Sequence, residues 1–115
     1  MNYIAIPGLK FKAHRMPPGS LKFITCNKIV DVVCAYFNYS VDDLKVRKRV
    51  RPLCYARQVC MYFLIKDSSL TLTEIGKLFA MDHTTVIHAR ETIKDLLSND
   101  QRIRNDIGNI NDLIQ

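Results

Sequence analysis

The sequence predicts an all-α domain preceded by an extended N-terminal arm, and three observations carry this prediction. The chain has 115 residues and is 48% hydrophobic, which is long enough for one core and too apolar for disorder. Glycine and proline number only 4 each, so residues that break helices are sparse. Apolar residues recur every three or four positions after the first twenty-five or so. We therefore expect an arm over residues 1–23 and one helical domain over residues 24–115.

The arm itself is apolar over Tyr3–Leu9, then basic, and ends in the turn signal Pro17-Pro18-Gly19. We expect it to pack on the domain. Two alternatives stay open: it holds a protein partner, or it follows a DNA groove, as basic arms do in other DNA-binding domains.

A first helix is expected from about Cys26 to Asn38, with Thr25 as its cap. Its buried stripe should contain Ile29, Val32, Val33, Tyr36 and Phe37. A short helical turn over Val41–Leu44 should follow.

The helix from Leu53 to about Lys66 is predicted to be the central packing element, because it is apolar over much of its girth. Pro52 suits its first turn, where an amide hydrogen is not needed. The stripe on one side consists of Leu53, Ala56, Val59, Cys60, Phe63 and Leu64.

A helical hairpin is predicted next. Thr71 and Glu74 have the spacing of a capping box, and Ile75, Leu78 and Phe79 follow as an apolar stripe. Gly76 would let a second helix cross closely. That second helix should begin after Asp82, whose carboxylate is expected to cap it, and should bury Val86, Ala89 and Ile93. Two capped helices joined by a short turn are typical of a helix-turn-helix.

A last helix is expected over Arg102–Leu113, after the break Ser98-Asn99-Asp100. Its stripe should contain Ile103, Ile107, Ile110 and Ile114, weakened by Gly108.

The charge is unevenly placed. Seventeen Lys and Arg against eleven Asp and Glu give +6, and six of the basic residues fall within one window that contains no acid. This pattern indicates phosphate binding, while the alternative is a solvated loop. The window contains Lys45, Arg47, Lys48, Arg49, Arg51 and Arg57. Outside it, Lys77, Arg90 and Lys94 lie near the hairpin and would add phosphate contacts or simply face water. Arg102 and Arg104 are expected to be solvated.

The sequence does not have the patterns of a membrane-spanning, secreted or zinc-binding protein. No apolar run approaches the roughly 18 residues of a membrane span, and no secretion signal opens the chain. Cys26, Cys34, Cys54 and Cys60 lack the paired short spacing of zinc sites, so we expect reduced thiols in a cytoplasmic protein.

No catalytic or metal-binding pattern is present in the sequence. His83 and His88 are five residues apart, unlike the i, i+4 pair of a zinc helix. No nucleophile is accompanied by a positioned base. We expect no enzyme activity, no metal and no cofactor.

Four stretches in order together resemble one family: the basic loop, Ala56–Leu64, Leu72–Gly76 and Asp82–Ala89. The run Asp-His-Thr-Thr-Val is specific to it. The chain, over roughly residues 24–114, resembles the C-terminal DNA-binding domain (domain IV) of the bacterial replication initiator DnaA. The fold that this implies is all-α, with a helix-turn-helix like that of the Trp repressor.

The resemblance implies a site. Asp82, His83 and Thr84 would contact base edges in the major groove, and Arg49 would enter the adjacent minor groove. The phosphate contacts would be Thr85, His88, Arg57 and Gln58, with the remaining basic residues beside them: Lys45, Arg47, Lys48, Arg51, Lys77 and Arg90. The chemistry agrees with these roles. A carboxylate can accept a hydrogen bond from the cytosine amino group, and an arginine is attracted by the enhanced negative potential of a narrow A·T-rich minor groove.

Three departures from the family are visible. The turn Phe79-Ala80-Met81 is shorter than the usual Gly-Gly-Arg type and lacks its arginine, which would change the angle of the second helix. Ala56 replaces a proline often found there. No Gly-rich phosphate loop of an ATPase is present, so these residues alone would bind DNA without unwinding it by ATP-driven assembly.

The function expected is sequence-specific binding of double-stranded DNA at sites of DnaA-box type, in replication initiation or its regulation. We expect a cytoplasmic monomer that associates with the nucleoid and not with a membrane. Alternatives are a transcriptional repressor or competitor at the same sites, a protein-interaction module that keeps the fold, and shape-driven nucleic-acid binding without base reading.

Overall fold

The computed structural model describes residues 21–45 and 51–114, with side chains from Thr25 onward. Over these residues the chain forms six α-helices and no strand, which confirms the all-α prediction. None of the helices described is both long and apolar enough to cross a membrane. Residues 1–20, which make up most of the predicted arm over residues 1–23, lie outside the described residues. Residues 46–50 of the basic loop, with Arg47, Lys48 and Arg49, lie outside them as well. The helices are α1 (Leu21–Phe37), α2 (Val41–Lys45), α3 (Arg51–Asp67), α4 (Leu72–Leu78), α5 (His83–Asn99) and α6 (Gln101–Ile114).

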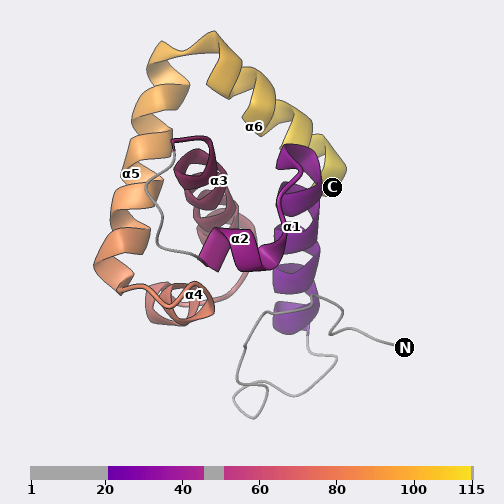
Figure 1. Ribbon diagram of the computed structural model, residues 1–115, viewed down its shortest axis with the longest axis vertical. Coiled ribbons are helices and arrows are strands. Elements are labelled where there is room, and N and C mark those ends of the chain that lie inside the picture. The colour runs from indigo at the N-terminus through magenta and orange to yellow at the C-terminus, as the bar shows by residue number, and fades with distance from the viewer. Residues whose placement is uncertain (1–20, 46–50, 115) are drawn as a thin grey trace.

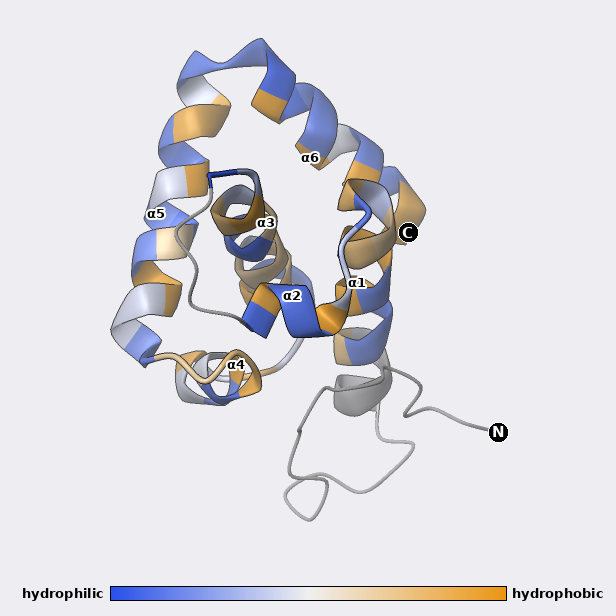
Figure 2. Ribbon diagram, in the orientation of Figure 1, coloured by the Kyte–Doolittle hydropathy of each residue, from blue (hydrophilic) through white to orange (hydrophobic). Residues whose placement is uncertain are grey.

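Helix α3 lies at the centre of the molecule and packs against α1, α2, α4 and α5 (Figure 1). The stripe predicted for it is fully confirmed, because all six of its residues are buried. Helices α5 and α6 arch around α3 and α6 reaches α1, so that the hydrophobic segments of α5 and α6 turn toward the interior (Figure 2). The stripe predicted for α6 is buried as well.

Helix α1 begins at Leu21, five residues before the predicted start. The sequence pattern predicts Thr25 as the cap, but Leu21–Ile24 contain neither glycine nor proline, so nothing in this segment opposes a helix. The predicted boundary between arm and domain therefore falls inside one continuous helix.

The end of α1 is where the sequence placed it. Asn38 has φ 61°, and the amide hydrogens of Asn38 and Tyr39 donate to the carbonyls of Ala35 and Cys34 at 3.3 and 3.0 Å. This is a Schellman ending, and asparagine tolerates its left-handed position well. The chain then turns into α2, whose start is held by reciprocal hydrogen bonds between Ser40 and Asp43.

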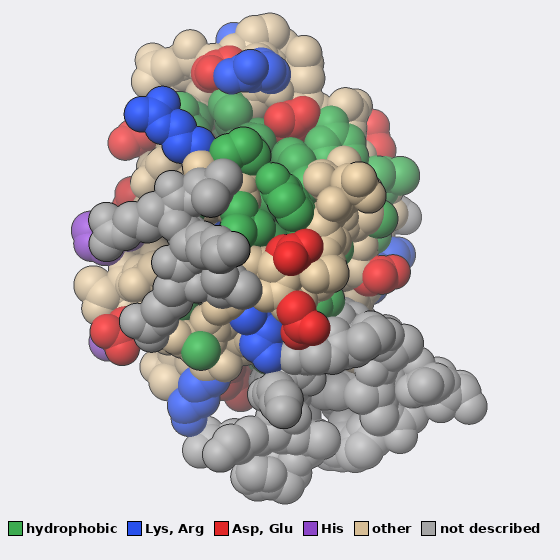
Figure 3. Space-filling view, in the orientation of Figure 1, with side chains coloured by type: hydrophobic (Ala, Val, Ile, Leu, Met, Phe, Trp, Pro, Cys, Tyr) green, Lys and Arg blue, Asp and Glu red, His purple; other side chains and the backbone are tan. Residues whose placement is uncertain are grey.

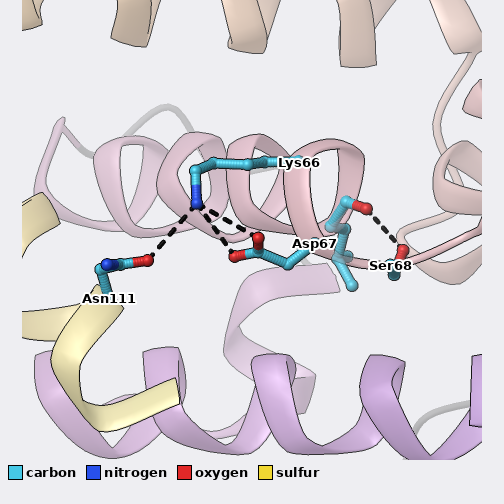
Figure 4. A network of polar contacts seen from close by, with 5 residues as sticks. Lys66, Asp67, Ser68 and Asn111 are labelled. Atoms are coloured by element: carbon cyan, nitrogen blue, oxygen red, sulfur yellow. Dashed lines mark hydrogen bonds and ion pairs between the residues drawn. The ribbon is translucent and has the colours of Figure 1, made fainter. Parts of the chain in front are cut away.

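Helix α6 is fastened to its neighbours by polar groups. The hydroxyls of Tyr36 (α1) and Tyr55 (α3) donate to the two carboxylate oxygens of Asp106 at 2.9 and 2.8 Å. Further along, Lys66 of α3 points to Asn111 of α6 as well as to its neighbour Asp67 (Figure 4), with Nζ 3.4 Å from the Asn111 amide oxygen. These contacts hold α6 across the ends of α1 and α3.

Candidate nucleic-acid interface

The hairpin α4–α5 starts from a complete capping box. The Glu74 amide hydrogen donates to Thr71 Oγ1 at 3.1 Å, and the Thr71 amide hydrogen donates to Glu74 Oε1 at 2.8 Å. The predicted pair is therefore confirmed in both directions. Ile75 and Leu78 are buried beneath it and fix the helix against the core.

The turn between the two helices is a Schellman motif. The amide hydrogen of Met81 donates to the Gly76 carbonyl at 2.8 Å, and that of Ala80 donates to the Lys77 carbonyl at 3.3 Å. Ala80 takes the left-handed position with φ 54°, where glycine is the usual residue. The short turn is thus closed by backbone bonds at the expense of a strained alanine.

Gly76 has the role that the sequence predicted. A Cβ at this position would lie 2.5 Å from the Met81 carbonyl oxygen and 3.4 Å from the His83 amide nitrogen. The start of α5 therefore sits directly on the backbone of α4, at a distance that only glycine permits.

The first turn of α5 presents polar side chains to solvent. His83, Thr84 and Thr85 are exposed, and His88 is exposed one turn further on. On the opposite side, the three predicted core residues Val86, Ala89 and Ile93 are buried. In Figure 3 the histidine side chains lie at the left edge, over α5. One element thus combines a rigid apolar back with a hydrogen-bonding front.

The expected side-chain cap of α5 is absent. Asp82 occupies the N-cap position with φ −71° and ψ 154°, but its carboxylate makes no capping hydrogen bond. The prediction that this carboxylate caps the helix was therefore wrong. The exposed carboxylate is left facing outward beside His83 and Thr84.

The described residues predicted to contact phosphate differ in their exposure. Lys77 on α4 and Arg51 at the start of α3 are exposed, and Lys45 and Gln58 are partly buried. Arg90 forms an ion pair with Glu91, with Nε 3.0 Å from Oε2. Because exposed ion pairs contribute little to stability, a phosphate can replace the Glu91 carboxylate at little cost.

Arg57 departs from the expected surface position. Its side chain is only 7% exposed, and its Nε donates to the Leu44 carbonyl at 2.7 Å, tying α3 to the last turn of α2. Helical spacing could have shown this, because Arg57 lies four residues after Leu53 and three before Cys60, on the buried face. Arg57 is thus built into the support of the basic loop rather than aimed at solvent.

The cysteines behave as core residues. Burial raises the pKa of the Cys26 thiol to about 12 and that of Cys34 to about 11, and it also raises the pKa of Cys60. Nearby carboxylates, Glu74 for Cys26 and Asp31 for Cys34, add to the effect. These thiols are free and stay protonated near neutral pH, the inert form. Among the described side chains, no three potential metal ligands gather.

A capped two-helix hairpin, whose second helix shows a polar first turn over a buried back, is the helix-turn-helix arrangement. Residues 26–93 match the family described as "Bacterial dnaA protein helix-turn-helix". The chain belongs to this family.

Individual relatives of the chain are in line with this family match. The chain is 39% identical over 84 residues to the "Chromosomal replication initiator protein DnaA" of Caldanaerobacter subterraneus subsp. tengcongensis, and equally to those of Thermoanaerobacter sp. (strain X514) and Thermoanaerobacter pseudethanolicus. Each match covers 73% of this chain but only 19% of the relative. The chain therefore corresponds to about a fifth of these initiators.

Proposed function

We propose that the domain binds double-stranded DNA sequence-specifically, at sites of DnaA-box type, and acts in replication initiation or its regulation. The observation that carries this proposal is the first turn of α5. There the Asp82 carboxylate, which makes no capping hydrogen bond, is exposed together with the His83 imidazole and the Thr84 hydroxyl, while the opposite face of the helix is buried in the core. Membership in the DnaA helix-turn-helix family supports DNA binding as the coarse function.

Base reading falls to Asp82, His83 and Thr84 in this proposal. The major groove displays donors and acceptors that differ for every base pair. The Asp82 carboxylate accepts a hydrogen bond from a cytosine amino group, and the Thr84 methyl contacts a thymine methyl. Arg49 enters the neighbouring minor groove, where a narrow A·T-rich segment has an enhanced negative potential.

Phosphate contacts set the register without reading sequence. Helix α5 supplies Thr85, His88 and Arg90, and α4 supplies Lys77. From the basic loop and its borders come Lys45, Arg47, Lys48 and Arg51, with Gln58 beside them. Arg57 acts indirectly in this scheme, because its bond to the Leu44 carbonyl fixes the point from which the loop departs.

The proposal is tested by fluorescence anisotropy on a labelled duplex carrying a DnaA box and on a scrambled duplex of equal length, over a series of salt concentrations. We expect affinity to fall with salt on both duplexes, since released counterions accompany phosphate neutralisation. The preference for the box should persist as salt rises.

His83→Ala and Arg49→Ala should each reduce that preference, whereas Lys28→Gln, an exposed change on α1, should leave it intact. Equal affinity for box and scrambled duplexes would contradict sequence-specific reading and leave shape-driven binding. Failure of the folded domain to bind either duplex would leave a protein-interaction module.

A further inference from the structure

An open hollow lies between the start of α3 and the first turns of α6. Its volume is about 380 Å³. Its α3 side begins directly after residues 46–50 of the basic loop. The hollow therefore borders the basic window on one side and α6, which is outside the hairpin, on the other. The residues that line it are Arg51, Pro52, Tyr55, Arg102, Ile103 and Asp106.

Both arginines of the hollow are exposed. Within the described residues, the ion pairs are those of Lys66 with Asp67 and Arg90 with Glu91, so neither Arg51 nor Arg102 forms an ion pair with a carboxylate there. Two guanidinium groups of like charge at one hollow repel each other and favour an anion between them.

The only acidic residue of the hollow is already engaged. Asp106 accepts hydrogen bonds from Tyr36 on one oxygen and from Tyr55 on the other. Burial, followed by the hydrogen bond to Asp106, raises the pKa of the Tyr55 hydroxyl. The phenol therefore stays protonated at physiological pH and keeps donating to the carboxylate, both of whose oxygens are already hydrogen-bonded.

The same bonds make the hollow a fixed feature. Asp106 lies one helical turn after Arg102, and Tyr55 lies one turn after Arg51, so the Tyr55–Asp106 bond holds the two arginine-bearing turns together. On the face shown in Figure 3, Lys and Arg side chains lie beside the hydrophobic patch below α6. Guanidinium groups on rigid turns lose less freedom on binding phosphate than groups on a loop.

We propose that Arg51 and Arg102 together bind a phosphate of the DNA backbone in duplex that flanks the recognised site. This inference rests on the proposed function and extends it, because it gives α6 a direct contact with DNA. Arginine suits the task, since its planar fork can donate two parallel hydrogen bonds to one phosphate. Arg102, read from the sequence as a solvated residue, becomes part of the interface.

The test compares wild type, Arg102→Gln, Arg102→Lys and Lys28→Gln on three duplexes. One carries the box with a flank of about 10 base pairs, roughly one helical turn, on each side, and the other two lack one flank or the other. Lys28→Gln removes the same charge from an exposed position on α1. Thermal unfolding of each variant confirms that the fold is kept.

On the doubly flanked duplex, Arg102→Gln should weaken binding about 3- to 10-fold and lower the slope of log affinity against log salt by about 0.9, the value for one phosphate contact. Arg102→Lys should retain most of the slope. On one of the two trimmed duplexes, wild type and Arg102→Gln should bind equally.

The inference is overturned if wild type binds the box while Arg102→Gln behaves as Lys28→Gln does on all three duplexes. Failure of wild type to bind any duplex would instead overturn the proposed function, and this inference with it. The two failures are thus distinguishable in one experiment.

Discussion

The starts of α4 and α5 both carry a residue typical of an N-cap, but the two side chains behave differently in the structure. At the start of α4, Thr71 caps the helix and Glu74 returns the bond. At the start of α5, Asp82 occupies the same N-cap position with a similar extended backbone, yet its side chain makes no capping bond. One cap stabilises the fold, and the other leaves its acceptor available to a ligand.

Helix α5 is held in place by features outside its cap. Helix α5 is already positioned by the Schellman turn behind it, by Gly76 beneath it and by Val86, Ala89 and Ile93 in the core. A helix held by packing needs less from its first residue. The polar groups of that turn are therefore free for binding.

The largest expected effect is that of Gly76→Ala, which removes the support beneath α5. The new Cβ would lie 2.5 Å from the Met81 carbonyl oxygen, a backbone atom that cannot rotate away. We expect the free energy of unfolding to fall by about 2 kcal/mol, as measured by urea denaturation. Affinity for the box should fall as well, because the start of α5 must shift.

Gly108→Ala is the matched control, since it places the same methyl group on another helical glycine. Nothing lies within 4 Å of that Cβ, so the gain in helix propensity should raise the free energy of unfolding by about 0.5–1 kcal/mol. If both substitutions stabilised the domain, the close approach at Gly76 would be refuted.

Thr71→Ala removes the cap that is in use. The loss of the hydrogen bond to the Glu74 amide should cost about 1 kcal/mol of stability, read from the shift of the urea midpoint. Box preference should not change at temperatures where the domain is folded, because Thr71 lies at the far end of α4 from the turn. An altered preference would mean that the two caps are not separate in function.

Ala80→Gly should give the smallest change, and a favourable one. Alanine in the left-handed region is strained by about 1–2 kcal/mol, while glycine loses about 0.5–1 kcal/mol more in chain entropy on folding. The net gain expected is about 0.5 kcal/mol, measurable as a higher melting temperature. A loss of stability would show that the φ of 54° at Ala80 is not strained.

Much of this fold follows from sequence patterns. Spacing alone predicted the buried faces of α3, α5 and α6, and the Thr71–Glu74 pair predicted a capping box, because these features depend on residues close in sequence. The start of α1 was missed because a threonine can cap a helix or continue one, and only the surrounding chain decides.

The candidate site was less predictable, since its features depend on distant partners. Arg57 looked like a surface cation within a basic window, but the Leu44 carbonyl, thirteen residues earlier, gives it a buried partner. The hollow between Arg51 and Arg102 requires two residues far apart in sequence to meet, and no local pattern indicates this. The capping hydrogen bond predicted for Asp82 was wrong as well. Residue preference says which side chains can cap a helix start, but not whether a particular side chain makes the bond.

The proposal that Asp82 reads a base instead of capping α5 is tested most directly by a paired measurement on Asp82→Ala. Stability is measured by urea denaturation and box preference by anisotropy. Since no side-chain cap is lost, the free energy of unfolding should fall by no more than about 0.5 kcal/mol, the size of a residual interaction with the helix dipole. Preference for the box over a scrambled duplex should fall about 10-fold or more, as for the loss of one good base contact. A fall in stability as large as that of Thr71→Ala, with box preference intact, would show that Asp82 is a structural cap and not a base contact.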